Sequence, residues 1–339
     1  MRRRILIALL LSAGLAAGTT AWVRDYLDRP LTISAPGYQL EIARGSSWAA
    51  VAHQVASDGV TPWAPVLLAY GRLSGQSGRI QAGEYLLPPG TTPRTLLAEL
   101  SAGRVVQHKL TLVEGWSLKE ILRAIAAEPA LRQTLAVTDP AALSRELGLQ
   151  LPSAEGAFLP ETYLFARGTT DRDLLLRANA ALNDRLARAW TARSPNLPLA
   201  RSYELLILAS IVERETALAR ERPLIAGVFV RRLQKGMRLQ TDPTVIYGLG
   251  SRFDGNLTRL DLETDTPWNT YTRDGLPPTP IAAASGAAID AAARPAEGTA
   301  LFFVATGAGD GSHRFTNTLE EHQAAIRDYL AALNRRDQD

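Results

Sequence analysis

The first 23 residues limit what this chain can fold into more than any other segment does. Arg2, Arg3 and Arg4 are followed by Ile5–Val23, a run of 19 residues without a charged side chain. As a helix, this run would be about 28 Å long at about 1.5 Å per residue, which is close to the hydrocarbon thickness of a bilayer. The arginines are expected to stay in the cytoplasm, so that the rest of the chain is exported.

A cleavable signal peptide is the alternative interpretation, because Ala16, Ala17 and Gly18 are small residues of the kind that cleavage sites use. The run is long for a signal peptide, however, and the charged pair Arg24-Asp25 follows it directly. We therefore predict a single-pass anchor in the cell inner membrane over residues 1–27. The N-terminus would be cytoplasmic and the remaining domains periplasmic.

Composition excludes several other classes of protein. The formal net charge of +3 owes much to the three N-terminal arginines, so the basic pI is weak evidence for nucleic-acid binding, and no nucleic-acid partner is predicted. The chain has no cysteine, which excludes disulfides, thiolate zinc sites and a cysteine nucleophile. Its four histidines lack metal-ligand spacing. We predict neither a metal nor a cofactor.

The exported part reads as an α+β fold with two domains. Residues 28–37 contain two prolines and a glycine and are expected to form a linker. Residues 38–104 show the order strand, helix, helix, strand, which resembles a LysM-like carbohydrate-binding subdomain. Residues 105–335 form a larger α+β domain, with a helix expected from Tyr203 to about Ala219 and irregular loops from Thr241 to Ser285.

The helix that begins near Tyr203 carries the strongest chemical signal. Glu213 ends an apolar run of eight residues, Leu205–Val212, and shares its helix face mostly with small residues. Burial there would raise its pKa and suit it to general acid catalysis. The pattern alone leaves two alternatives open. Glu213 and Glu215 can equally mark the solvated end of a core helix, and periodicity does not choose between the two carboxylates.

Polar groups that suit a sugar ligand gather in three other segments. Gln240, Asp242 and Tyr247 lie in a loop that Pro243 is expected to stiffen. Asn269 and Tyr271 combine an amide with an aromatic ring, as sugar sites often do. A third segment could place Glu155 or Glu161 near a cleft. Ordinary turns remain the alternative interpretation of all three segments.

Taken in order, these motifs resemble the YceG-like family of endolytic murein transglycosylases, over about residues 38 to 330. The residues that carry the resemblance are Glu114-Gly115, Glu155-Gly-Ala-Phe158-Leu-Pro160-Glu161-Thr-Tyr163, Ala209-Ser-Ile-Val-Glu213-Arg-Glu215-Thr216, Leu239-Gln-Thr-Asp-Pro-Thr-Val-Ile-Tyr-Gly248, Asn269-Thr-Tyr271 and Gly275-Leu-Pro-Pro278.

The resemblance implies a lytic transglycosylase that cuts the β-1,4 bond between N-acetylmuramic acid and N-acetylglucosamine in nascent peptidoglycan strands. The product would be a 1,6-anhydromuramoyl end, and the role would be to terminate strand elongation. The family's catalytic glutamate maps onto Glu213. The substrate-binding positions would be Gln240, Asp242, Tyr247, Asn269, Tyr271, Glu161 and Thr216. Peptidoglycan synthases would be partners, although no sequence feature shows that contact.

One segment departs from the family pattern. An Asn-Pro-Gly turn usually follows the Pro-Pro-x-Pro-Ile stretch, whereas this chain reads Ala284-Ser285-Gly286. We expect the change to alter the loop and to leave Glu213 untouched. Two other functions remain open: a hydrolase that pairs Glu213 with Asp242, Glu155 or Glu161, and a non-catalytic scaffold that binds the cell wall.

Overall fold

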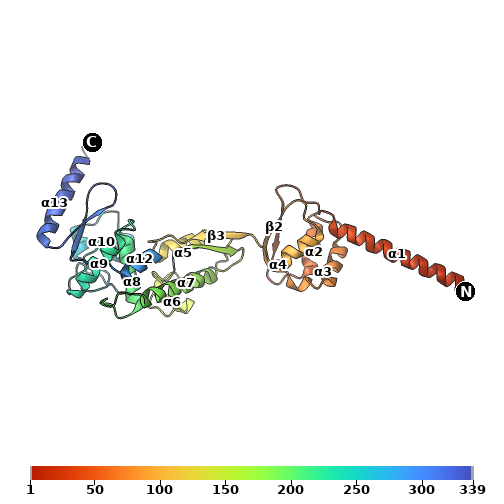
Figure 1. Cartoon of the computed structure of the whole chain (residues 1–339), viewed down its shortest axis with the longest axis horizontal. Coiled ribbons are helices and arrows are strands. Elements are labelled where there is room, and N and C mark those ends of the chain that lie inside the picture. Colours follow the sequence, from red (N-terminus) through yellow and green to blue (C-terminus); the bar gives the residue numbers. More distant parts are fainter. Residues whose placement is uncertain (1, 337–339) are drawn as a thin grey trace. The chain divides into compact units, whose positions relative to one another are not determined.

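The computed structural model describes residues 2–336 and divides them into two compact units (Figure 1). Among the described residues, unit 1 contains 2–108 and 164–169, and unit 2 contains 109–163 and 170–336. Strands β3 (Gln107–Thr111) and β4 (Thr162–Ala166) form a two-stranded sheet, and the division between the units falls inside both strands. The fold is therefore a mixture of helices and small sheets.

Unit 1 begins with α1 (Arg2–Asp28), the helix that contains the apolar run. Within residues 3–28, an 18-residue window has a mean hydropathy of 1.8, so this helix is long and apolar enough to cross a membrane. A signal sequence would meet the same criterion, so this property shows a candidate span and no more.

The rest of unit 1 has a small core that packs on a two-stranded antiparallel sheet. Strands β1 and β2 are antiparallel, with Tyr38 opposite Leu87 and Ile42 opposite Gly83. The core residues include Leu40, Trp48, Tyr85 and Leu97. The elements of this part are β1 (Tyr38–Ile42), α2 (Trp48–Ser57), α3 (Ala64–Leu73), β2 (Gly83–Leu87) and α4 (Pro93–Ala102).

The segment expected to be a linker contributes to this core. Leu31 is buried, and its amide N–H donates to the Thr91 carbonyl at 2.8 Å. The Thr32 N–H donates to the Val60 carbonyl at 3.0 Å. These bonds attach at least the first part of residues 28–37 to the folded unit.

A buried carboxylate ties the two sequence segments of unit 1 together. Glu84 on β2 accepts a hydrogen bond from Arg167 Nε at 2.8 Å, and His108 Nε2 lies 2.8 Å from the same oxygen. These contacts lower the pKa of Glu84 to about 2, with the Arg167 hydrogen bond as the largest cause. Residues 164–169 therefore join unit 1 through an ion pair that opposes the cost of burying the carboxylate.

Unit 2 is organised around α8 (Ser202–Glu215), whose apolar run Leu205–Val212 is wholly buried. Helices α7, α9 and α12 pack against it. The alanines of α12 allow a close approach because they carry short side chains. The other helices and strands are α5 (Leu118–Ala126), α6 (Pro140–Leu147), α7 (Asp171–Thr191), α9 (Arg222–Gln234), α10 (Asp242–Leu249), α11 (Arg259–Glu263), α12 (Gly286–Ala293), β5 (Phe302–Ala305), β6 (His313–Thr316) and α13 (Leu319–Arg336).

Two details of unit 2 differ from the sequence-based expectation. Helix α8 ends at Glu215 rather than near Ala219, and the segment expected to be irregular contains α10 and α11. Pro243 stands in the first turn of α10, where a missing N–H costs no hydrogen bond, so it starts a helix instead of stiffening a loop.

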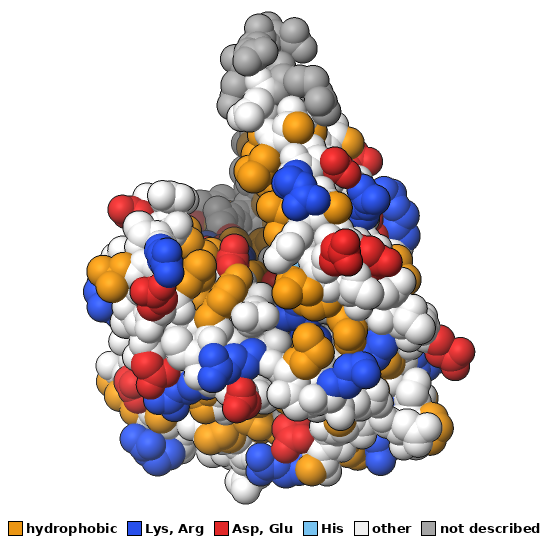
Figure 2. Space-filling model, turned by 90° about the vertical axis from the view of Figure 1, so that its left-hand side faces the viewer, with side chains coloured by type: hydrophobic (Ala, Val, Ile, Leu, Met, Phe, Trp, Pro, Cys, Tyr) orange, Lys and Arg blue, Asp and Glu red, His pale blue; other side chains and the backbone are white. Residues whose placement is uncertain are grey.

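The surface shows no simple charge pattern on the face drawn in Figure 2. Basic and acidic side chains alternate there, with hydrophobic side chains between them. A nucleic-acid site would call for a stripe of one sign, which this face does not display.

Candidate active site

A cavity of about 740 Å³ opens beside the last turn of α8. Its walls come from the end of β3, from the turn before β4 and from the start of α9. Four carboxylates and two guanidinium groups line it. The lining residues are Thr111, Leu112, Val113, Glu114, Gly115, Pro160, Glu161, Thr162, Glu213, Arg214, Glu215, Thr216, Ala217 and Arg222.

Glu213 lies in this wall with both carboxylate oxygens engaged. Its side chain is 5% exposed. Arg222 Nη2 donates to Oε1 at 3.0 Å, and the Ser285 N–H donates to Oε2 at 2.9 Å. The Ser285 hydroxyl also donates to Oε2. A charged donor and two neutral donors therefore fix the orientation of the carboxylate.

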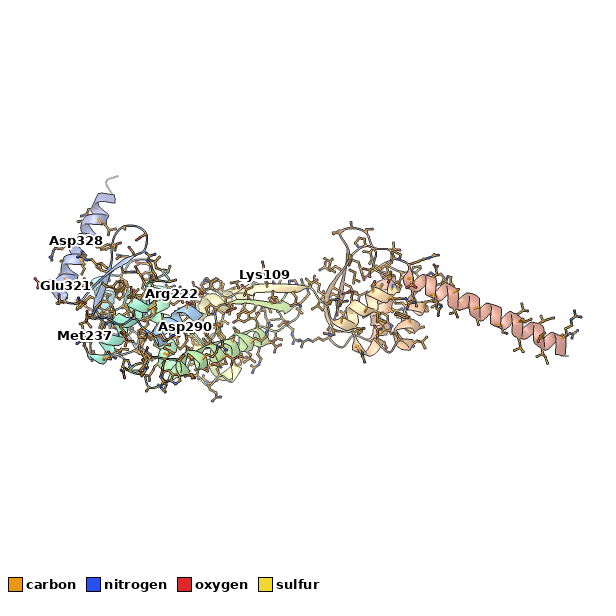
Figure 3. The ribbon with its side chains drawn as sticks, viewed as in Figure 1. Lys109, Arg222, Met237, Asp290, Glu321 and Asp328 are labelled. Carbon is orange, nitrogen blue, oxygen red and sulfur yellow. The ribbon has the colours of Figure 1, made fainter. Side chains whose placement is uncertain are left out.

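The partners of Glu213 come from the starts of two helices. Arg222 is the first residue of α9 (Figure 3), and it also lies 3.8 Å from Glu114. Ser285 is the N-cap of α12, where its Oγ accepts from the Ala288 N–H at 3.1 Å. The N-terminal end of α12 thus faces Glu213 and contributes the Ser285 N–H to its carboxylate.

The expectation that the Ala284-Ser285-Gly286 departure leaves Glu213 untouched is wrong. Ser285 supplies two of the three hydrogen bonds to that carboxylate. A serine at this position caps α12 and points its hydroxyl at the end of α8, where α8 and α12 pack together. Sequence reasoning treated the segment as a loop and missed both Ser285 and Arg222 as neighbours of Glu213.

Glu215 lies two residues further along the same cavity wall in different surroundings. It accepts a hydrogen bond from the Thr241 hydroxyl. Burial raises the pKa of Glu215 to about 7, and the negative charge of Asp242 adds to the shift, while Thr241 and Arg232 oppose it. Glu215 can therefore hold a proton near neutral pH.

Two of the predicted substrate-binding residues line the cavity. Glu161 is exposed, and its carbonyl oxygen accepts from the Leu112 N–H at 3.0 Å. Thr216 follows the end of α8, and its Oγ1 accepts from the Leu218 N–H at 3.0 Å. Both are in place to meet a ligand in the cavity.

The predicted residues of the 240–247 segment are not among the cavity-lining residues. Gln240 has a φ of 50°, and its side-chain oxygen lies 3.4 Å from Arg232 Nη1. Asp242 accepts from the Tyr271 hydroxyl at 2.6 Å. This segment reaches the cavity wall through Thr241, which binds Glu215.

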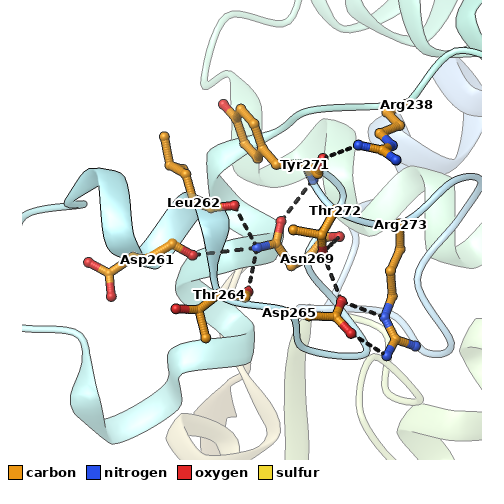
Figure 4. Close-up of polar contacts among 9 residues, drawn as sticks. All are labelled: Arg238, Asp261, Leu262, Thr264, Asp265, Asn269, Tyr271, Thr272 and Arg273. Carbon is orange, nitrogen blue, oxygen red and sulfur yellow. Dashed lines mark hydrogen bonds and ion pairs between the residues drawn. The ribbon is translucent and has the colours of Figure 1, made fainter.

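Asn269 is fully buried and holds a loop in shape (Figure 4). Its Nδ2 donates to the carbonyl oxygens of Leu262 at 3.0 Å and Thr264 at 2.7 Å. Its Oδ1 accepts from the Tyr271 N–H at 2.8 Å. With its amide used by backbone groups, Asn269 organises the loop that presents Tyr271 to Asp242.

Glu155 and Tyr247 contact each other, and neither is among the residues that line the cavity. Glu155 is 3% exposed and accepts from the Leu118 N–H at 2.9 Å, the Gly156 N–H at 3.2 Å and the Tyr247 hydroxyl at 3.1 Å. Burial raises the pKa of Glu155 to about 7. Tyr247 packs edge-on against Trp268. These contacts join α5, the 153–157 turn and α10.

The sequence of this chain is similar to those of several known proteins. The YceG-like family model matches residues 40–328. An endolytic murein transglycosylase of Bacillus subtilis (strain 168) is 31% identical over 314 residues, covering 88% of this chain and 86% of the relative. An endolytic murein transglycosylase of Streptococcus pneumoniae serotype 2 is 29% identical over 293 residues, covering 74% of this chain and 51% of that relative.

A solved structure is similar as well. The crystal structure of a yceG-like protein from Listeria monocytogenes superposes with a TM-score of 0.53 at 28% identity, covering 86% of this chain and 99% of that one. Together with the family model, which covers most of the chain, these similarities show that this protein belongs to the YceG-like family.

Proposed function

We propose that this protein is an endolytic peptidoglycan lytic transglycosylase. Its substrate would be the β-1,4 bond between N-acetylmuramic acid and N-acetylglucosamine in nascent glycan strands, and its product a 1,6-anhydromuramoyl end. The family and the names of two relatives support this activity. The observation that carries the proposal is Glu213, a carboxyl group oriented by three donors in the wall of a large cavity.

In the first step, Glu213 in its protonated form donates to the glycosidic oxygen as the bond to C1 breaks. The resulting carboxylate is then met by Arg222 and by the two donors of Ser285. Because these groups are already in position, stabilising the new negative charge requires little reorganisation. Arg222 and Ser285 act as positioning residues in this scheme.

In the second step, the Glu213 carboxylate accepts the proton of the muramic C6 hydroxyl, whose oxygen closes onto C1. The anhydro ring forms, and Glu213 regains its proton. No water and no second carboxylate takes part in the bond changes. The transition state resembles an oxocarbenium ion, and the carboxylates of Glu161 and Glu114 in the cavity favour that positive charge.

The predicted substrate-binding residues have two roles in this proposal. Glu161 and Thr216 contact the glycan, because they line the cavity. Residues of the other two segments hold the backbone that carries Thr241, the partner of Glu215, through the contacts described above: Gln240, Asp242, Tyr247, Asn269 and Tyr271.

A paired-carboxylate hydrolase is the competing enzyme. Glu155 fits this role poorly since its oxygens are buried and bonded, whereas Glu161 is exposed in the same cavity as Glu213. Mass spectrometry of the fragments released from purified glycan strands separates the two reactions. Anhydromuramoyl ends are expected, and reducing ends would show hydrolysis.

The scaffold hypothesis is tested on the same substrate with Glu213→Gln. A folded variant that binds strands without cutting them is expected if Glu213 is the acid. If the unmodified protein binds strands and releases no fragments, the chain is a wall-binding scaffold.

We also propose the location and domain roles that the sequence predicts. Residues 1–27 would form a single-pass inner-membrane anchor with a cytoplasmic N-terminus, supported by the apolar helix α1. Residues 38–104 would be a LysM-like subdomain, supported by the β1–β2 pair and its helices, and residues 105–335 the catalytic domain. Anchoring would place the active site where new strands emerge, beside peptidoglycan synthases.

A further inference from the structure

The end of α1 is packed into unit 1. Leu27, in the last turn of α1, is buried, and the Tyr26 hydroxyl lies 2.7 Å from Thr61 Oγ1. Leu31, three residues after α1, is also buried and bonds to Thr91. The helix and the globular part of unit 1 therefore have a fixed junction. The depth of α1 in a membrane would determine the distance of the globular part from that membrane.

Aromatic rings from both sides meet at this junction. The Trp22 and Trp63 rings are 5.2 Å apart between centroids with an edge-to-face angle of 86°, and Trp22 also stacks on Tyr26 at 6.2 Å. Trp22 is 43% exposed and Trp63, just before α3, is 48% exposed. Pro62 and Pro65 beside Trp63 are exposed too. A large apolar surface thus stays uncovered next to the apolar helix.

Charged side chains mark where the apolar part of α1 stops. Arg24 follows Val23 directly, and Arg29 pairs with Asp25 at 2.6 Å. Arg94, at the start of α4, pairs with Asp28 at 2.6 Å. These groups are costly to bury in hydrocarbon, so the outer boundary of a membrane around α1 falls near residues 22–24.

From this junction we propose that unit 1 lies on the outer surface of the membrane, with Trp63 in the phospholipid headgroup layer. Trp22 stands at the end of the apolar run, and Trp63 touches it, so both rings lie at the same depth. Indole rings favour this layer because they combine an apolar body with a polar N–H. The inference rests on the proposed anchoring by α1 and adds a second, lipid-facing contact by the globular part.

The absence of cysteine allows a direct test by single-site labelling. Pro62→Cys in the full chain carries a nitroxide and keeps both tryptophans. Ala102→Cys is the matched control, because it is exposed at the far end of α4, about 12 Å along the helix from Arg94. Each labelled chain is placed in phosphatidylethanolamine–phosphatidylglycerol nanodiscs. The collision rate of the nitroxide with oxygen is then compared with its collision rate with a water-soluble nickel chelate.

At position 62, contact with oxygen is expected to exceed contact with the chelate, and the control should show the reverse. Equal chelate access at both positions, in chains that co-purify with the nanodiscs, would overturn the docking and leave the anchor standing. A chain that does not co-purify with the lipid would remove the anchor and the docking together.

The contribution of Trp63 is tested by adding Trp63→Ser to Pro62→Cys. Chelate access at position 62 is expected to rise at least several-fold, with the Ala102→Cys signal unchanged by the same substitution. Unchanged access at position 62 would show that Trp63 does not hold the surface to the lipid.

Discussion

Glu213 and Glu155 are two nearly buried carboxylates of unit 2 that each accept three hydrogen bonds. They differ in the charge of their hydrogen-bond donors and in whether the side chain lines a cavity. One donor to Glu213 is a guanidinium, and Glu213 lines a cavity. All three donors to Glu155 are neutral, and its side chain is enclosed. The guanidinium donor and the cavity suit Glu213 to the proposed chemistry, whereas the same number of hydrogen bonds holds Glu155 in the packed interior.

The largest expected effect separates the two carboxylates by activity. Glu213→Gln should lower the rate of strand cleavage by about 10³-fold, because an amide cannot donate and recover the proton. Glu155→Gln should stay within about tenfold of the unmodified protein, because its amide oxygen can still accept from the Leu118 N–H. The release of anhydromuramoyl fragments measures both. An equal loss in the two variants, with both folded, would contradict the comparison.

The second effect concerns stability and pH. The pKa of Glu155 is raised from 4.5 to about 7 by burial, so the folded state binds the proton more tightly than the unfolded state does. The contribution of Glu155 to the free energy of unfolding is therefore largest below about pH 4.5, and it falls as the pH rises towards 7. The loss approaches about 3 kcal/mol at most, at about 1.4 kcal/mol per pKa unit.

Glu155→Gln should remove this loss, so that the variant is more stable than the unmodified protein at pH 8 and similar to it at pH 4.5. Thermal unfolding in detergent at both pH values is the measurement. A smaller slope of the same sign should remain, because the pKa of Glu215 is raised in the same direction. Identical pH dependence in the two proteins would show that the hydrogen bonds to the Glu155 carboxylate fully offset the effect of burial on its pKa.

The sequence predicted the parts of this site that depend on residues close together in the chain. The apolar run Leu205–Val212 identified α8 and its carboxylate end because periodicity and burial are local properties. Pro243 misled the prediction, since a proline fits both a stiff loop and a first helical turn. The choice between them depends on the packing of α10.

A local sequence pattern could not identify the hydrogen-bond partners of Glu213. Arg222 and Ser285 are 9 and 72 residues away in the chain, and their approach depends on how α9 and α12 pack on α8. The one signal for Ser285 was its departure from the family turn, which shows that something changes there without showing what it touches. Likewise, Asn269 and Tyr247 carry polar groups suited to a ligand, but tertiary packing directs those groups to backbone and to Glu155.

The third effect tests the cation that distinguishes Glu213. Arg222→Met should lower kcat by about 10- to 100-fold with little change in KM, because the carboxylate formed during cleavage loses its charged donor. Arg222→Lys should recover part of the rate. Arg238→Met is the control, since Arg238 also pairs with a carboxylate, Asp274 at 3.0 Å, and is not among the residues that line the cavity. A raised KM with unchanged kcat would make Arg222 a substrate-binding residue instead.

The smallest effect belongs to the hydroxyl of Ser285. Ser285→Ala keeps the backbone N–H donor to Glu213 and removes the Oγ donor and the cap of α12. A hydrogen bond from a hydroxyl to a charged carboxylate contributes at least about 1.5 kcal/mol, so a fall in kcat of about tenfold is expected. Ser47→Ala removes a comparable helix cap in unit 1 and should leave the rate unchanged. Since the two variants lose the same kind of cap, a rate loss confined to Ser285→Ala would come from the carboxylate it orients, whereas equal rates in both would reduce Ser285 to a helix cap.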